Sequence, residues 1–159
     1  MKQLYHRRDF AKQAGLVCLA FSWPFKINTV MDPKGVMVLS SAYSVKETID
    51  RLQQFLQQHG AIIYARINQQ EEAVKAGLQL PPLEFILFGN PKIGGAVMAE
   101  TPVAALDLPL KVIAWEEHPG KVKIAYNKAS YLEERYSLSS AATSTLDLEH
   151  IVAAALANK

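Results

Sequence analysis

Residues 85–100, FILFGNPKIGGAVMAE, place an asparagine, a lysine and four small or rigid residues directly behind an apolar run. A glycine-rich turn beside a lysine can cradle phosphate, because free backbone amides and an ammonium group face the anion. A Walker-type loop has the pattern Gly-x-x-x-x-Gly-Lys-Ser/Thr. Counted from Gly89, the second glycine is Gly94, but Gly95 and Ala96 stand where the lysine and the hydroxyl residue are required. The sequence does not match a dinucleotide-binding loop either, because Pro91 and Lys92 stand where the backbone must approach the pyrophosphate. The pattern therefore predicts a tight strand-to-helix turn.

Ten residues in and after this stretch are candidates for a site. Those expected to organise the loop are Gly89, Pro91, Gly94, Gly95 and Pro109. Those expected to contact a ligand are Asn90, Lys92, Asp107, Trp115 and Tyr126. Lys92 could hold a carboxylate or sulfate, while Asn90 and Asp107 can also hydrogen-bond nearby backbone in turns. The aromatic residues Phe85, Phe88, Trp115 and Tyr126 could line an apolar pocket between sheet and helix, although aromatic residues in strands more often belong to the core.

The alternative chemistry is acid-base catalysis by Asp107 with Glu116 or Glu117, around the loop from Gly89 to Gly95. Nucleophilic catalysis lacks support, since the chain has no Gly-x-Ser-x-Gly motif. Its only cysteine, Cys18, lies in the N-terminal region. The sequence thus favours a non-catalytic protein over a hydrolase-like or other acid-base enzyme.

Metal binding has little support in the histidines. His59, His118 and His150 fall on different expected elements, and no two of them have the spacing of metal ligands. We therefore expect no metal and no cofactor.

The charge of the chain is concentrated at its beginning. The 159 residues have a formal net charge of +2, yet residues 1–25 hold four cations against one aspartate, which leaves −1 for the rest. Without a basic excess the body cannot neutralise a phosphate backbone, so we expect no nucleic-acid partner. Half of the residues are hydrophobic, as in an ordinary globular protein with one core.

Residues 1–25 resemble an export signal. Arg7-Arg8, followed by Phe10 and Lys12, is similar to the twin-arginine pattern, and an apolar run of about ten residues follows. That run is too short to span a bilayer, so no stable transmembrane segment is expected. We expect cleavage between about Phe21 and Met31 and a periplasmic or otherwise exported protein. A cytoplasmic protein with an irregular N-terminal helix is the alternative.

The remaining chain predicts one α+β domain over residues 34–159. Strands are expected from Val36 and over 61–67, 83–88, 110–116 and 121–126, the last two joined by the turn at 118–120. A capping box at Ser44 and Glu47 predicts a helix that ends before Gly60, and a short helix is expected over 71–77.

The C-terminal part should be helical with one interruption. Ser130 and Glu133 repeat the capping pattern and predict a helix in SYLEERY. Residues 137–144 are expected to form a linker before a C-terminal helix over 145–158. The resulting order, β-α-β-β-β-β-α with a final helix, predicts two layers: an antiparallel sheet with helices mainly on one face.

Three segments carry a resemblance to a known family. FGNPKIGGAVM, DLPLKVIAWEEHPGKVKIAYN and YLEERYSL resemble, in this order, the bacterial family called domain of unknown function 302, over residues 39–138. The resemblance implies a small α+β domain and no known reaction. It also implies that Gly89, Asn90, Pro91, Asp107 and Pro109 are positions that the family keeps. We expect an exported module that binds a small molecule or a protein and can form a homodimer through its sheet edges, with a purely structural protein as a further alternative.

Overall fold

The computed structural model describes residues 33–157 of the chain. The described residues belong to one compact unit. The export-signal prediction for residues 1–25, including Cys18, therefore lies outside the described residues. Within the described part, none of the helices has both the length and the apolar character needed to span a membrane.

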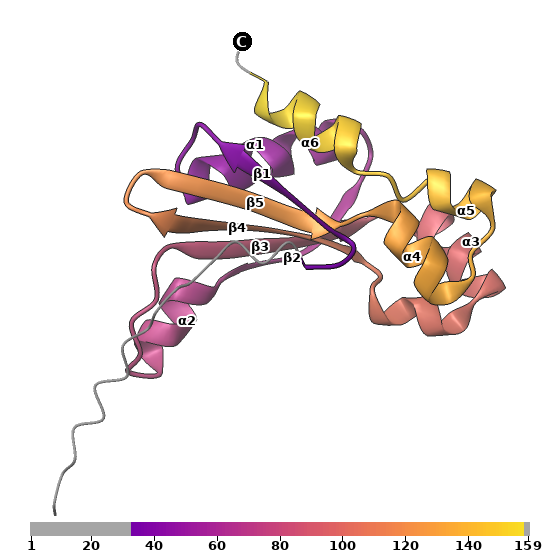
Figure 1. The fold of residues 1–159 in the computed structure, drawn as a ribbon, viewed down its shortest axis with the longest axis horizontal. Coiled ribbons are helices and arrows are strands. Elements are labelled where there is room, and N and C mark those ends of the chain that lie inside the picture. The colour runs from indigo at the N-terminus through magenta and orange to yellow at the C-terminus, as the bar shows by residue number, and fades with distance from the viewer. Residues whose placement is uncertain (1–32, 158–159) are drawn as a thin grey trace, which may run out of the picture. The chain divides into compact units, whose positions relative to one another are not determined.

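Five strands form one antiparallel sheet in the order β1-β5-β4-β3-β2 (Figure 1). The strands are β1 (Val36–Ser41), β2 (Ile62–Asn68), β3 (Leu83–Gly89), β4 (Leu110–His118) and β5 (Lys121–Asn127). The predicted hairpin of β4 and β5 is confirmed, and it turns at Gly120, whose φ of 73° suits glycine. The α+β prediction with an antiparallel sheet is confirmed as well.

Helix α1 (Val45–Gln58) crosses the sheet between its two edge strands. It begins where the Ser44 hydroxyl accepts a hydrogen bond from the Glu47 amide at 3.2 Å, which is one half of the predicted capping box. The other half is not formed, because the Glu47 carboxylate pairs with Arg51 instead. The buried face holds Val45, Thr48, Ile49, Leu52 and Leu56, whose spacing keeps them on one side of the helix.

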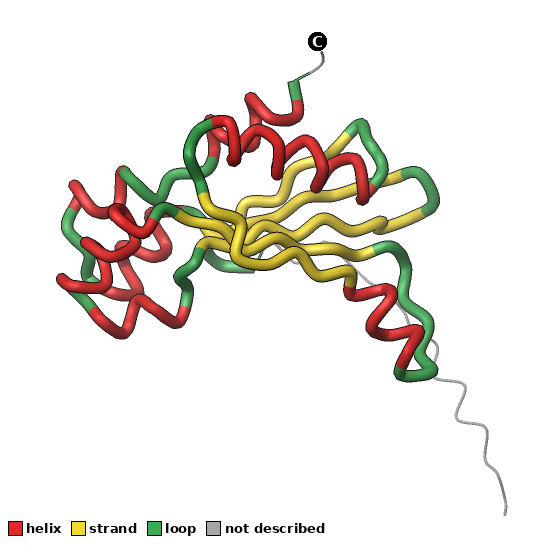
Figure 2. The backbone as a smooth tube through the Cα atoms, turned by 180° about the vertical axis from the view of Figure 1, so that it is seen from behind, coloured by secondary structure: helices red, strands yellow, loops and turns green. Residues whose placement is uncertain are grey.

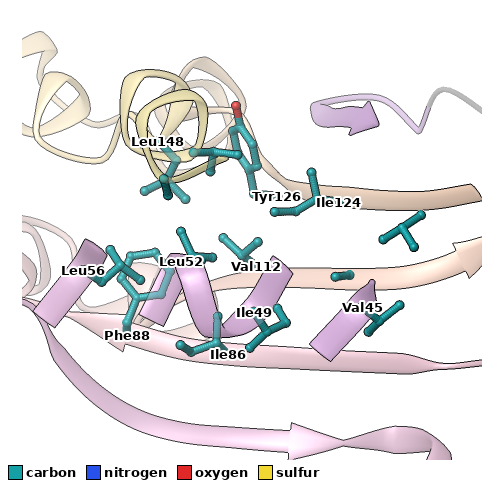
Figure 3. Close-up of a cluster of buried hydrophobic side chains, with 14 residues drawn as sticks. Val45, Ile49, Leu52, Leu56, Ile86, Phe88, Val112, Ile124, Tyr126 and Leu148 are labelled. Carbon is teal, nitrogen blue, oxygen red and sulfur yellow. The ribbon is translucent and has the colours of Figure 1, made fainter. Parts of the chain in front are cut away.

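The main hydrophobic core lies between α1, the C-terminal helix α6 (Glu149–Leu156) and one face of the sheet (Figures 2 and 3). Ile49, Ile86, Val112, Ile124 and Val152 have no exposed surface. Burying a side chain of this size stabilises a fold by roughly 1.5–3 kcal/mol relative to exposure. This face of the sheet therefore supplies much of the stability of the domain.

A network of charged side chains ties α1 to β2 and β3. Arg66 donates to Glu84 at 2.7 and 2.9 Å and to Asp50 at 2.5 Å. Glu84 is only 7% exposed, so its charge is compensated by Arg66 rather than by water. Asp50 also accepts from Lys46, and the hydrogen bonds from Lys46 and Arg66 lower the pKa of Asp50.

A second group of helices lies beyond one end of the sheet (Figure 1). It comprises α3 (Pro91–Glu100), the 3-10 helix η1 (Pro102–Leu106), α4 (Ala129–Tyr136) and α5 (Ser140–Ser144). Its apolar side chains form a separate cluster of Val97, Ala104, Leu132, Tyr136, Leu138 and Leu146. At the other end of the strands, α2 (Gln69–Lys75) extends away from β2 and β3.

Three helix predictions need correction. The helix expected from a cap at Ser130 begins earlier, at Ala129, and its N-cap Lys128 makes no side-chain cap. The linker expected at 137–144 contains α5, which begins where the Ser139 hydroxyl accepts from the Ala142 amide. The C-terminal helix starts at Glu149 instead of residue 145.

Candidate functional site

A cavity of about 540 Å³ lies where the end of α1, the start of α3 and helix α6 meet the end of β3. Its apolar wall includes Phe55, Phe88, Leu110, Leu148 and Ile151. The sequence predicted an apolar pocket between sheet and helix near the glycine-rich segment, and the cavity lies beside that segment. Of the aromatic candidates, Phe88 lines the cavity, whereas Phe85, Trp115 and Tyr126 do not.

Helix α3 forms one wall with two glycines. Gly94 and Gly95 both line the cavity, and a Cβ atom added to either would meet no neighbouring atom within 4 Å. Neither glycine has a positive φ, so neither is required by the local backbone. The two glycines therefore leave volume open that ordinary helical side chains would occupy.

The lining contains few polar groups, among them Asn90, His59 and His150. The His59 ring stacks on Phe55 with centroids 4.1 Å apart, and its Nδ1 lies 2.7 Å from the Phe55 carbonyl oxygen. Because a carbonyl oxygen only accepts, Nδ1 is the donor in this hydrogen bond. In the neutral ring, Nε2 is then free to accept from a ligand. The described residues that line the cavity include no Asp, Glu, Lys or Arg.

The cavity lies on the boundary between the two hydrophobic clusters. Leu56, Phe88 and Leu148 belong to the sheet core, whereas Leu146 belongs to the cluster of the second helical group. Leu110 packs against both clusters and also lines the cavity. A molecule in this space would contact both parts of the domain.

Asn90 is one of the predicted ligand residues, and it lines the cavity. It is the N-cap of α3, where its Oδ1 accepts from the Lys92 amide at 2.9 Å. Its Nδ2 has no hydrogen-bond partner among residues 33–157, so that group could donate to a ligand. The Lys92 side chain is exposed, does not line the cavity and forms no ion pair in the described region.

Asp107 instead connects three elements at a smaller cavity, which adjoins the first and shares Leu108, Pro109, Leu110 and Leu148 with it. Its carboxylate accepts from the Tyr136 hydroxyl at 2.5 Å and from Asn127 Nδ2 at 3.3 Å, and Arg135 Nε lies 3.6 Å away. Burial raises the pKa of Tyr136, and the hydrogen bond to Asp107 raises it further. These contacts hold the turn before β4 against β5 and α4.

The acid-base alternative required Asp107 to lie near Glu116 or Glu117. Asp107 precedes β4, whereas both glutamates lie close to its far end. At about 3.3 Å per residue, six residues of extended strand separate such groups by roughly 20 Å. The structure does not bring these carboxylates together.

Tyr126 and Trp115 lie on opposite faces of the sheet. Tyr126 is in the core under α6 (Figure 3), and its hydroxyl has no hydrogen-bond partner among residues 33–157. Burial raises the pKa of Tyr126, and the nearby charges of Glu149 and Asp147 add to the effect. Trp115 pairs with Leu83 and Lys123 on the other face. The five predicted ligand residues therefore do not form one site.

The residues assigned to a glycine-rich loop also differ from expectation. Gly89 ends β3, Pro91 is the first residue of α3, and Gly94 and Gly95 lie inside this helix. The connection between strand and helix is Asn90 alone. Pro109, preceded by a cis peptide bond, follows η1 and lines the cavity with Gly89.

Residues 37–155 of this chain match a family model described as domain of unknown function DUF302. The chain belongs to the DUF302 family. A crystal structure of an uncharacterized conserved DUF302 protein from Bacillus stearothermophilus superimposes with a TM-score of 0.65 at 25% identity. The match covers 78% of this chain and 97% of that one.

Curated relatives of this DUF302 chain include the fluoride-specific ion channel FluC 1 of Brucella suis. It is 38% identical over 104 residues, which are 65% of this chain and 41% of the relative. FluC 2 of Brucella melitensis shares the same identity over 38% of its length. The DUF302 chain thus spans about two fifths of the curated relatives it matches.

Sequence reasoning missed four polar residues that line the DUF302 cavity, namely His59, Tyr64, Thr145 and His150. The two histidines were expected on different elements, and no spacing rule joins residues so far apart in the chain. A usable signal lay in Gly94 and Gly95, because adjacent glycines inside a helix call for a packing reason. That reason could have pointed to open space beside α3.

Proposed function

We propose that this DUF302 protein is an exported, non-catalytic binding protein whose cavity takes a small, mainly apolar molecule. The observation that supports the proposal is the cavity of about 540 Å³ between α1, α3 and α6. Sites for small molecules in proteins have volumes of roughly 300–1,000 Å³, mostly apolar walls and a few polar groups that fix orientation. This cavity has all three properties.

The lining sets the chemistry of the ligand. With no charged side chain among the described lining residues, the cavity offers no ion-pair partner to a phosphate or other strong anion. His59 Nε2 can accept one hydrogen bond, and Asn90 Nδ2 can donate one. The favoured ligand has an apolar body and a single neutral polar group, such as an amide, a hydroxyl or a carbonyl.

The affinity should be modest. A ligand of about 20 non-hydrogen atoms at roughly 0.3 kcal/mol per atom would bind with about −6 kcal/mol, which corresponds to a dissociation constant of about 40 µM. This affinity falls within the range of a fluorescence titration.

The test is a titration of the full chain with the neutral fluorophore N-phenyl-1-naphthylamine. Gly95→Leu places a side chain in the cavity and should weaken binding at least tenfold. Ala99→Leu is the matched control, because Ala99 is exposed on the same helix and does not line the cavity. Equal binding by the wild-type chain and Gly95→Leu would exclude this cavity as the site. No measurable binding by the wild-type chain would exclude the proposed ligand class.

Export is supported by the sequence of residues 1–25 and needs its own test. Replacing Arg7 and Arg8 together with lysine keeps the charge but removes the paired guanidinium groups. In cell fractionation, the wild-type chain should be found outside the cytoplasm, and the double variant should accumulate inside it. A cytoplasmic wild-type chain would refute export and leave the binding proposal intact.

A further inference from the structure

The face of the sheet opposite α1 and α6 carries a continuous apolar row across all five strands. The strand register aligns Ile67 with Phe85, Phe85 with Ile113, Ile113 with Ala125, and Ala125 with Val38. This row, which we call the apolar row, consists of Ile67, Phe85, Ile113, Ala125 and Val38. Ala125 is buried, and the other four members are half-buried.

The two flanking rows are apolar near β3 and polar near β5. On one side, Leu83 and Trp115 continue into Lys123 and Ser40; on the other, Leu87 is followed by Lys111 and Asn127. The Lys111 ammonium lies 5.4 Å from the centre of the Phe85 ring. The face therefore has an apolar centre with lysines beside it.

The described helices leave this face open. Helices α1 and α6 pack on the other side of the strands (Figure 2), and α2 extends beyond the ends of β2 and β3. The second helical group packs beyond the opposite end. An antiparallel sheet with one solvated face shows alternating apolar and polar residues. Here β3 reads LEFILFG, with Glu84 its only charged residue, as in a strand that is covered on both faces.

We propose that a second copy of this chain covers the apolar row, so that two sheets pack face to face in a symmetric homodimer. This inference goes beyond the proposed function and does not depend on it. It also differs from dimerisation through sheet edges, because the contact uses side chains rather than backbone hydrogen bonds. Sheets packed in this way lie about 10 Å apart with interdigitated side chains.

The width of the face favours a second copy over a single segment of chain. Five strands at about 4.8 Å spacing give a face roughly 20 Å wide, whereas one helix is about 10–12 Å wide. Six residues per strand make it roughly 20 Å long, about 400 Å² in projection. Side-chain relief brings the accessible area closer to the roughly 600–800 Å² per subunit of a stable interface. The same face of another copy has the same dimensions and the same apolar row, and the long lysine side chains beside the row can extend their charged ends towards water.

The first test is the mass of the full chain in solution, measured by light scattering after size exclusion and by native mass spectrometry. The wild-type chain should be a dimer. Ile113→Lys places a charge at the centre of the apolar row and should give a monomer of unchanged circular dichroism. Val74→Lys is the matched control, since Val74 is 61% exposed on α2 and away from this face; it should remain a dimer.

A second measurement keeps the test independent of folding of the Ile113 variant. Trp23 and Trp115 are the two tryptophans of the chain. In a Trp23→Phe background, Trp115 emission should shift to longer wavelength on dilution, as the dimer dissociates and water reaches the indole ring. A wild-type monomer at high concentration would overturn the proposal. So would a dimer that survives Ile113→Lys, and that result would direct attention to the sheet edges.

Discussion

Replacing Gly94 and Gly95 with alanine tests whether the wall of α3 is open space. Both glycines are helical, and an added Cβ at either would meet no atom within 4 Å. The substitution therefore adds neither a clash nor a packing contact. What remains is the intrinsic effect of the residue on the helix, because alanine has less backbone freedom to lose on folding than glycine.

The expected magnitude is about 0.5–1 kcal/mol of added stability for each substitution in a helix interior. Together the two should raise the free energy of unfolding by about 1–2 kcal/mol. For a domain of this size, 1 kcal/mol corresponds to roughly 4 °C in melting temperature. The double variant should therefore melt about 4–8 °C above the wild-type chain.

Gly77→Ala is the matched control for this experiment. A Cβ at Gly77 also meets no atom within 4 Å, but the residue has a φ of 78°. Alanine in this left-handed conformation is less favourable by roughly 1–2 kcal/mol, so Gly77→Ala should lower the melting temperature. Calorimetry or circular dichroism measures both changes. A lower melting temperature for Gly94→Ala/Gly95→Ala would refute the assignment of these glycines to an open cavity wall.

Three further predictions concern polar groups in and around the sheet core. Arg66→Ala should destabilise the domain by about 3–5 kcal/mol, because Glu84 is left buried without its partner, and Glu84→Gln in the same background should restore part of the loss in urea unfolding. Hydrogen bonds from Lys46 and Arg66 lower the pKa of Asp50. The ionised carboxylate therefore adds to the free energy of unfolding above the ordinary pKa of aspartate, and this stabilisation is lost as the pH falls through the lowered pKa. The difference in stability between the wild-type chain and Asp50→Asn, measured by urea unfolding, should vanish in strong acid. Tyr126→Phe should leave the melting temperature unchanged or raise it, because the hydroxyl that it removes is buried without a hydrogen-bond partner, and a drop of several degrees would mean that this hydroxyl has a partner in solution.

Much of the fold could be predicted because its signals are local. Ser44 and the spacing from Val45 to Leu56 define α1, and Gly120 defines the hairpin, since each needs only neighbouring residues. Helix α5 was missed because its short, small-residue sequence has no apolar periodicity, although Ser139 does provide a cap. The order of strands in the sheet depends on long-range pairing, which no local rule specifies.

The candidate site was predicted only in part, because it is assembled from distant segments. Asn90 was a candidate because it stands between Gly89 and Pro91 at the start of the predicted turn, and it does line the cavity. Asp107 looked like a ligand residue, but its contact with Tyr136 arises from packing of α4 against the turn before β4. His59 and His150 meet the same cavity from α1 and α6, whose contact exists only in the folded chain.

The position of the cavity between two hydrophobic clusters has a consequence for cooperativity. Clusters that share few side chains can open as separate units, with different free energies of local unfolding. Leu110 packs against both clusters, but the other residues that line the cavity from the two clusters face open space rather than each other. A molecule bound there would contact both clusters, so that amide hydrogens in α3, α4 and α5 would exchange at rates closer to those of the sheet. Binding of a molecule in the cavity would then change the free energies of local unfolding without changing the fold.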